Sequence, residues 1–217
     1  MRFWRKQPRF PPTITVSSPW RRRWPTMLVF TLIAFVAVCD RASRRPVPSS
    51  NPVASIGTDH DRYHNRMFRV ARVVDGDTLD IDVPDGNKPM TRIRLWGVDT
   101  PEVKGSPKGE MYFGPQASEF AKRILTGRSV YVVLAPEKTR GKYGRLLAYV
   151  MLDRGGKMFN ELLLEKGLAY ADRRFPHAYR KQFEAIEKRA RRAGVGLWAD
   201  ITIEKMPGWR QRFERKP

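Results

Sequence analysis

Apolar and polar residues alternate in several short stretches after residue 66, which is the pattern of half-buried β-strands. Turn residues separate the first stretches, at Asp75-Gly76-Asp77 and at Pro84-Asp85-Gly86-Asn87. The alternation predicts five strands, at 68–74, 78–83, 92–98, 129–134 and 146–151. The first three follow one another directly, so we expect them to form a meander.

Apolar residues at helical spacing predict three helices, at 115–126, 159–166 and 179–192. A proline opens the first segment at a position that helices tolerate, and a glycine lies within two residues after each segment. Five strands with a helix after the third match a small Greek-key barrel. We therefore predict an α+β fold that is mainly β, a five-stranded OB-fold Greek-key barrel with about three helices.

The start of the chain has a different pattern, because a basic region precedes 16 uncharged residues, Trp24 to Cys39. A spanning helix needs about 20 apolar residues, so this segment fits the apolar region of an export signal better than a membrane span. Basic residues before it favour a cytoplasmic N-terminus with the remainder exported. Ala37-Val38-Cys39 is a poor cleavage site, which leaves an uncleaved anchor as an alternative. A buried helix of a soluble protein is a further alternative.

These patterns divide the chain into four parts. A basic region with an apolar signal or anchor segment covers 1–39, and a linker rich in Arg, Pro and Ser covers 40–65. The folded domain covers 66–200, and a basic tail covers 201–217. We expect an exported protein, which is secreted or periplasmic or is anchored to the membrane through 24–39.

The charge indicates a polyanionic partner. Lys and Arg number 42 against 22 Asp and Glu, a net charge of +20, and both 1–65 (11 basic, 3 acidic) and 66–217 (31 basic, 19 acidic) share the excess. Nucleic acid is the partner that such a charge favours, although a membrane surface or an acidic polysaccharide would also attract it. A single cysteine excludes an intramolecular disulfide and a thiolate metal cluster, and the three histidines lack the spacing of a zinc site.

The stretch RIRLWGVDTPE, Arg92 to Glu102, carries the candidate chemistry. A short strand ends there in two acids, Asp99 and Glu102, and Pro101 holds them on a stiff turn. Rigid acids near an arginine such as Arg94 suit chemistry on a phosphate, because carboxylates bind a hard divalent cation and the guanidinium fork binds the anion. An all-oxygen site favours Ca²⁺, with Mg²⁺ or Mn²⁺ as alternatives.

Other charged residues near this stretch are expected to have no catalytic role. Arg92 is expected to form a surface ion pair. Asp80 and Asp82 alternate along the second predicted strand, and we expect both to face solvent.

Two further motifs accompany this stretch, DGDT at 75–78 and KYGR at 142–145. The segments GPQAS at 114–118, NELL at 160–163, GLA at 167–169 and GLW at 196–198 follow in the same order. With these motifs, the chain from Phe68 to Trp198 resembles the staphylococcal nuclease-like family, the thermonucleases.

The resemblance implies a calcium-dependent phosphodiesterase, an endonuclease that acts on DNA, RNA or both. It implies that the metal ligands are Asp77, Asp99 and the backbone carbonyl of Thr100, with Asp75 in a supporting role. The catalytic residues that it implies are Arg94, Glu102 and Arg145. The substrate-binding residues that it implies are Tyr143, Lys142 and Tyr170. Family members often have a second aromatic residue soon after GLA, where this chain has Asp172.

Two alternatives belong to other functional classes. A catalytically inactive nucleic-acid-binding OB-fold module would share the barrel but need not keep the whole set of acids and arginines. A basic adaptor anchored to the envelope would leave that set unexplained. The set is complete, so the sequence favours the nuclease. As a separate expectation, we favour a monomer.

Overall fold

The structure is a computed structural model that describes residues 58–215 except 108 and 137. All described residues belong to one compact unit. The predictions for 1–39 and for the linker up to residue 57 lie outside the described residues. Within the described part of the chain, no helix has the length and apolar character to cross a membrane.

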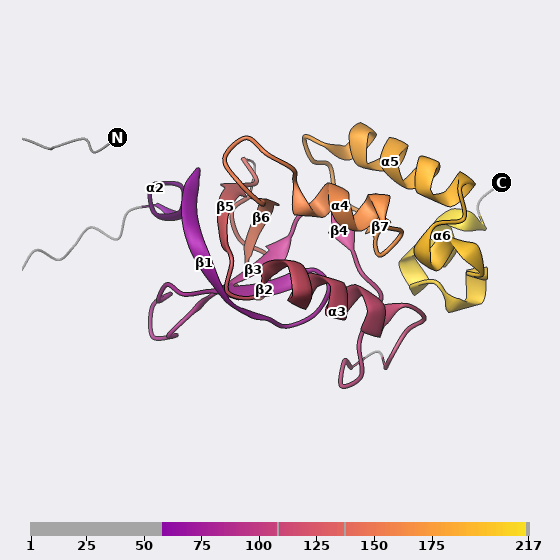
Figure 1. The fold of residues 1–217 in the computed structure, drawn as a ribbon, viewed down its shortest axis with the longest axis horizontal. Helices are drawn as coiled ribbons and strands as arrows, with labels where there is room; N and C mark the ends of the chain where they lie inside the picture. The colour runs from indigo at the N-terminus through magenta and orange to yellow at the C-terminus, as the bar shows by residue number, and fades with distance from the viewer. Residues whose placement is uncertain (1–57, 108, 137, 216–217) are drawn as a thin grey trace, which may run out of the picture. The chain divides into compact units, whose positions relative to one another are not determined.

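Five strands form the closed barrel that the sequence predicts (Figure 1). They are β1 (Arg66–Val73), β2 (Thr78–Ile81), β3 (Thr91–Leu95), β5 (Ser129–Leu134) and β6 (Leu146–Met151). Their order around the barrel is β1-β2-β3-β6-β5, and neighbouring strands pair antiparallel except for the parallel pair β3–β6. The predicted OB-fold barrel is therefore confirmed.

The alternation in β3 shows how the sequence forms this barrel. Ile93 and Leu95 are buried in the barrel core, whereas Arg92 is exposed and Arg94 is half-buried on the opposite face. Burial of each such aliphatic side chain contributes about 1.5 to 3 kcal/mol, so a shift of one residue in register would be strongly unfavourable. The core thereby fixes the direction in which Arg94 points.

Three helices match the predicted segments: α3 (Gly114–Leu125), α4 (Phe159–Glu165) and α5 (Arg180–Arg192). Helix α3 packs on β1, α4 packs on β6, and α5 packs on α4. A second, small sheet joins β4 (Val98–Asp99) to β7 (Tyr170–Ala171) in antiparallel pairing. The described residues contain five α-helices instead of about three, because α2 and α6 were not predicted.

Helix α2 (Asp59–Tyr63) lies in the segment that the sequence assigned to a linker. Thr58 and Asp61 form a capping box around its first turn, and the Tyr63 side chain is buried in the barrel core. Asp59 pairs with Arg140 at 2.7 Å. The folded unit therefore begins by residue 58. A five-residue helix is too short to show a helical period, so the sequence gives no signal for α2. The boundary placed at residue 65 stays a prediction.

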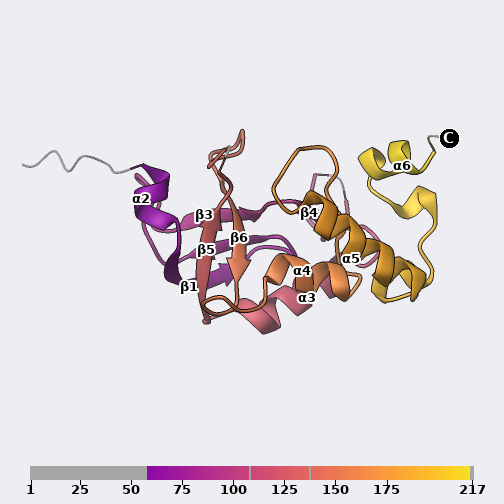
Figure 2. The ribbon, with the colours of Figure 1, turned by 90° about the horizontal axis from the view of Figure 1, so that it is seen from above.

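Helix α6 (Gly208–Glu214) lies in the segment that the sequence assigned to a basic tail. It follows the short 3₁₀ helices η1 (Gly196–Ala199) and η2 (Ile203–Lys205). Trp209 and Arg210 are buried, and Arg210 pairs with Glu187 of α5 at 3.0 Å. Figure 2 shows α5 and α6 together at one end of the barrel. Residues 201–215 are therefore folded, although the boundary placed at residue 200 stays a prediction.

Candidate active site

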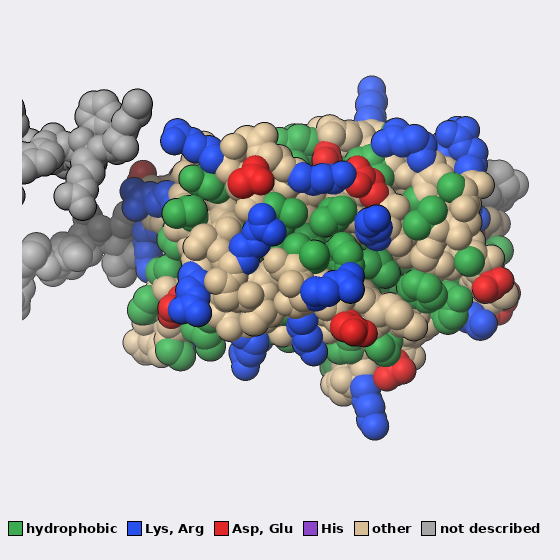
Figure 3. Space-filling model, in the orientation of Figure 1, with side chains coloured by type: hydrophobic (Ala, Val, Ile, Leu, Met, Phe, Trp, Pro, Cys, Tyr) green, Lys and Arg blue, Asp and Glu red, His purple; other side chains and the backbone are tan. Residues whose placement is uncertain are grey.

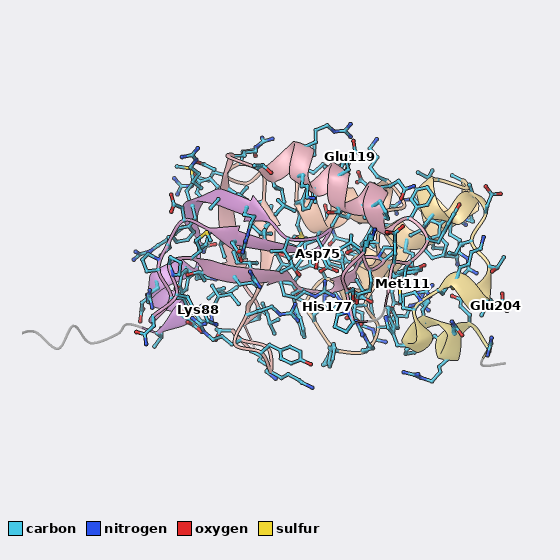
Figure 4. All side chains as sticks on the ribbon, turned by 90° about the horizontal axis from the view of Figure 1, so that it is seen from below. Asp75, Lys88, Met111, Glu119, His177 and Glu204 are labelled. Carbon is cyan, nitrogen blue, oxygen red and sulfur yellow. The ribbon has the colours of Figure 1, made fainter. Side chains whose placement is uncertain are left out.

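A cavity of about 640 Å³ collects residues from all three motifs. In Figure 4, Asp75 lies between the barrel strands and the end that carries α6. Nine of the predicted site residues line the cavity: Asp75, Asp77, Arg94, Asp99, Thr100, Glu102, Lys142, Tyr143 and Arg145. The tenth, Tyr170, does not.

The DGDT turn after β1 and the DTPE turn after β4 are in direct contact. The Thr100 backbone N–H donates to Asp77 Oδ2 at 2.7 Å, and the Thr100 hydroxyl lies 3.0 Å from the same oxygen. Gly76 makes this approach possible, because a Cβ at that position would lie 2.7 Å from Thr100 Cγ2. The two turns therefore hold the acids of both motifs at fixed positions.

Arg94 bridges the two predicted metal ligands. Its Nη1 pairs with Asp77 Oδ1, and its Nη2 pairs with Asp99 Oδ1 at 2.5 Å. The Arg94 side chain is only 16% exposed, which strengthens both ion pairs relative to surface ones. A single positive group thus lies between two carboxylates.

Asp99 has further partners that the sequence did not indicate. Arg174, which follows β7, lies 3.1 Å from Asp99 Oδ1 and also pairs with Asp172 at 2.8 Å. The indole N–H of Trp209 donates to Asp99 Oδ2 at 2.7 Å. Both oxygens of this carboxylate are therefore engaged, and one of their donors comes from α6.

Asp75 lies beside this group. Its carboxylate accepts the Asp77 backbone N–H at 3.1 Å, which closes the turn. Burial raises the pKa of Asp75, while the charge of Arg94 and hydrogen bonds from Thr78 oppose the rise. The site thus concentrates carboxylates that a nearby cation would stabilise in the charged form.

Glu102 lies at the junction between the DTPE turn and α3. Its carboxylate accepts the Ser106 hydroxyl at 2.8 Å, and its backbone carbonyl accepts the Met111 N–H at 2.9 Å. Gly114, the first residue of α3, packs so closely that a Cβ there would lie 2.0 Å from the Glu102 carbonyl oxygen. Glu102 is therefore fixed through its own backbone and through its carboxylate.

The loop between β5 and β6 supplies the KYGR residues. Arg145 is half-buried and makes no ion pair with any residue that the structure describes. Burial and the nearby charges of Arg94 and Arg92 lower the pKa of Arg145, although Asp75 opposes this. Tyr143 is 69% exposed, with Lys142 Nζ 4.9 Å and Arg145 Cζ 5.6 Å from its ring centroid. This wall of the cavity carries unbalanced positive charge and an accessible aromatic ring.

Tyr170 does not line the cavity. Its side chain is fully buried and packs edge-on against Trp198 at 5.5 Å and Trp209 at 6.3 Å between ring centroids. Burial raises the pKa of its hydroxyl. The structure therefore gives Tyr170 a packing role, and the predicted contact with substrate has no support in its position.

The residues present fit a hard divalent cation in their chemistry. The predicted donors, two carboxylates and a backbone carbonyl, are all oxygens. Only two of these donors are side chains, because the third is a backbone carbonyl. In the described part of the chain, no group of three or more His, Cys, Asp or Glu side chains is arranged to hold a metal ion. Arg94 places a positive group between Asp77 and Asp99, where a cation bound by both would also lie.

Sequence reasoning missed Trp209 and Arg174. The only signal for Trp209 is a lone tryptophan in a polar, basic segment, and nothing in that segment relates it to residue 99. Arg174 lies shortly after GLA, where Asp172 stands in place of the second aromatic residue of the family. Basic residues also spread over the surface in Figure 3, and several gather along α5.

Comparisons with known proteins show which family the chain is similar to. The family described as staphylococcal nuclease homologue matches residues 92–200. A thermonuclease of Staphylococcus hyicus is 35% identical over 170 residues, which are 78% of this chain and 96% of the relative. A thermonuclease of Staphylococcus intermedius is 41% identical over 153 residues, 70% of this chain and 86% of the relative. Endonuclease YncB of Bacillus subtilis is 33% identical over 147 residues, 66% of this chain and 67% of the relative.

Proposed function

The chain belongs to the family of staphylococcal nuclease homologues, and from this premise we infer that it is a nuclease that hydrolyses phosphodiester bonds of DNA, RNA or both. We propose further that it is an endonuclease that depends on a divalent cation, with Ca²⁺ as the preferred ion. One observation carries the proposal: acids and arginines of three separate motifs line a single cavity.

The arginines of the cavity suit the charge that develops during cleavage. Hydrolysis of a phosphodiester concentrates negative charge on the oxygens of the phosphoryl group. Arg145 has no carboxylate partner among the described residues, so its guanidinium is available to a phosphate. Arg94 approaches the same cavity, and it would exchange its bonds to Asp77 and Asp99 for bonds to the phosphate.

Glu102 is the candidate general base. Glu102 lines the cavity and its carboxylate accepts the Ser106 hydroxyl, so we assign it the proton from the water that attacks phosphorus. Such a proton transfer typically contributes about 10²- to 10⁴-fold to the rate. The proton leaves the water as the new P–O bond forms and the ester P–O bond breaks, and the leaving oxygen takes up a proton from solvent.

Asp77, Asp99 and the Thr100 carbonyl would hold the cation, with Asp75 beside them. When bound, a divalent cation supplies positive charge to the phosphoryl oxygens and favours deprotonation of a bound water. Oxygen donors alone favour Ca²⁺ over zinc, and Mg²⁺ and Mn²⁺ are the competing ions.

The test is a cleavage assay on the full chain with single- and double-stranded DNA and RNA. Cleavage should occur with Ca²⁺ and stop when a chelator is added. Glu102→Gln should retain binding but lose turnover, which controls for a contaminating nuclease. Binding without cleavage under Ca²⁺, Mg²⁺ and Mn²⁺ would support the alternative of an inactive nucleic-acid-binding module.

We also propose export, on the basis of the uncharged segment Trp24 to Cys39 and the basic residues before it. A reporter enzyme that is active only outside the cytoplasm should be active when fused after residue 65. A reporter that is active only in the cytoplasm would contradict export.

A further inference from the structure

Trp209 contacts a predicted metal ligand from outside the residues that the family match covers. The match ends at residue 200, yet the Trp209 indole N–H donates to Asp99 Oδ2 at 2.7 Å. We propose that Trp209 is a positioning residue that fixes the Asp99 carboxylate for cation binding. This inference rests on the proposed cation-dependent function.

The environment of α6 explains why the indole is held in place. Trp209 is 7% exposed and packs edge-on against Tyr170 and Phe213, at 6.3 and 6.0 Å between ring centroids. The next residue, Arg210, is 1% exposed and pairs with Glu187 of α5 at 3.0 Å. Removing one partner of such a buried pair is costly, so this pair anchors α6 to α5. The indole N–H therefore has little freedom to point elsewhere.

The hydrogen bond decides which oxygen of Asp99 faces the arginine side of the site. Oδ2 accepts the Trp209 N–H, while Oδ1 pairs with Arg94 at 2.5 Å and with Arg174 at 3.1 Å. A buried hydrogen bond to an ionised carboxylate is among the stronger ones in proteins. It stops rotation of the carboxylate and directs Oδ1 toward Arg94, the position that a cation shared with Asp77 would take.

Trp209 also supports Arg174. The Arg174 guanidinium carbon lies 4.5 Å from the Trp209 ring centroid, and the same guanidinium pairs with Asp99 Oδ1. One indole thus contacts both the carboxylate and one of its cationic partners. Trp209 does not line the cavity itself, so its effect acts through these two residues.

Another tryptophan of the same cluster provides a matched control. Trp198 is buried to the same degree, at 6% exposed, and also packs edge-on against Tyr170. Among the residues that the structure describes, its indole N–H has no hydrogen-bond partner, whereas that of Trp209 donates to Asp99. Phenylalanine at either position removes an indole N–H and part of a ring, but only Trp209→Phe removes a bond to the site.

The experiment compares full-length wild type, Trp209→Phe and Trp198→Phe by calorimetric titration with Ca²⁺ and by thermal unfolding. Loss of a partner that orients a metal ligand typically weakens metal binding by about 10- to 100-fold. We expect a shift of this size in the Ca²⁺ dissociation constant of Trp209→Phe and none in Trp198→Phe. Both variants should lose some thermal stability, because both lose packing. A Ca²⁺ affinity in Trp209→Phe equal to that of wild type, or an equal loss in both variants, would overturn the proposal.

A second measurement needs neither folded Trp209→Phe nor Ca²⁺. Asp99→Asn should shift the indole N–H resonance of Trp209 in a nitrogen-15 spectrum and leave that of Trp198 in place. An unmoved Trp209 resonance would mean that the hydrogen bond is absent, and the proposal would fail. If Asp99→Asn shifts the Trp209 resonance but wild type binds no Ca²⁺, the hydrogen bond is present and the proposed cation dependence is wrong. The role of Trp209 in cation binding would then fail with it.

Discussion

Asp80 and Asp99 are each bound by two arginines. The two clusters differ, because one joins strands of the barrel and the other lines the cavity. Asp80 pairs with Arg72 at 2.6 Å and with Arg92 at 2.7 Å. Asp80 is buried, while both guanidiniums remain partly exposed on the outer face of the barrel. Among the described residues, neither arginine pairs with another carboxylate. This cluster joins neighbouring strands and is complete in itself.

The cluster around Asp99 joins parts of the chain that are distant in sequence. Arg94 of β3 and Arg174 after β7 share Asp99 Oδ1, and Trp209 of α6 holds Oδ2. Arg94 also pairs with Asp77, so its charge is shared between two acids. Residues of this cluster line the cavity, so a ligand bound there would compete with its ion pairs.

Strand register accounts for the difference. Arg92 and Arg94 lie on the same face of β3, two residues apart. In the β2–β3 ladder Arg92 faces Asp80, which satisfies it directly. Arg94 faces Thr78, which carries no charge, so its guanidinium extends past β2 to Asp77. The residue opposite each arginine on β2 thus decides that Arg92 forms a structural ion pair and that Arg94 extends to the cavity.

The largest expected effect is on turnover. Arg94→Lys keeps the charge but cannot reproduce the planar fork, so turnover at saturating substrate should fall by about 10²- to 10³-fold. Arg92→Lys, with the same chemical change two residues away, should turn over like wild type. The measurement is the single-turnover rate of both variants. A comparable loss in both would erase the distinction between the clusters.

The second effect is on stability. Asp80→Asn removes the charge that Arg72 and Arg92 share, and it should lower the free energy of unfolding by about 1 to 2 kcal/mol, since both arginines retain contact with water. Its Ca²⁺ affinity should equal that of wild type. Asp99→Asn should lose measurable Ca²⁺ binding. Urea unfolding and calorimetry on both variants check this, and weak Ca²⁺ binding by Asp80→Asn would contradict it.

Much of the fold and of the site follows from local sequence pattern. The alternation of Ile93 and Leu95 with arginines predicts β3 and the face that Arg94 occupies, and the structure confirms both. The turn chemistry at Asp75 and Pro101 predicts where acids lie at strand ends, and the cavity brings them together. These features depend on neighbours in sequence or on the barrel core, which a periodic pattern reveals.

Features set by long-range pairing were not predictable in this way. Asp80 was expected to face solvent with Asp82, but Arg72 and Arg92 cover it, so it is 2% exposed. Trp209 reaches Asp99 across 110 positions, and α6 is held by a buried ion pair that reads as two surface charges in the sequence. Tyr170 has the position expected of a family aromatic, yet its neighbours in the fold bury it.

A smaller effect is the pH dependence of the Asp80 contribution. Burial alone would raise the pKa of Asp80, but hydrogen bonds and charges from Arg92 and Arg72 outweigh it and hold the pKa below its ordinary value of 3.8. Because the pKa of Asp80 is lower in the folded state, its carboxylate stabilises the fold fully at pH values above its pKa in the unfolded state. This stabilisation is lost as the pH falls through its pKa in the folded state. The difference in unfolding free energy between wild type and Asp80→Asn should therefore be constant from pH 7 to pH 5 and shrink below the ordinary pKa. A difference that grows on acidification would contradict this sign.

The smallest effect concerns arginines outside both clusters. Arg189 and Arg192 on the exposed side of α5 have no ion-pair partner among the described residues, and Lys and Arg gather there in Figure 3. If substrate phosphates reach α5, each of these arginines releases counterions on binding, and log affinity falls with log salt by about 0.9 per phosphate on duplex DNA.

The double variant Arg189→Gln with Arg192→Gln should therefore flatten the salt dependence of binding and leave turnover at saturation unchanged. Arg145→Lys is the matched opposite, because it keeps the charge and removes the fork. Its salt dependence should equal that of wild type while its turnover falls. Binding constants and turnover across a salt series separate the two outcomes. An unchanged slope in the double variant would show that the substrate does not reach α5, and wild-type turnover in Arg145→Lys would remove Arg145 from the catalytic site.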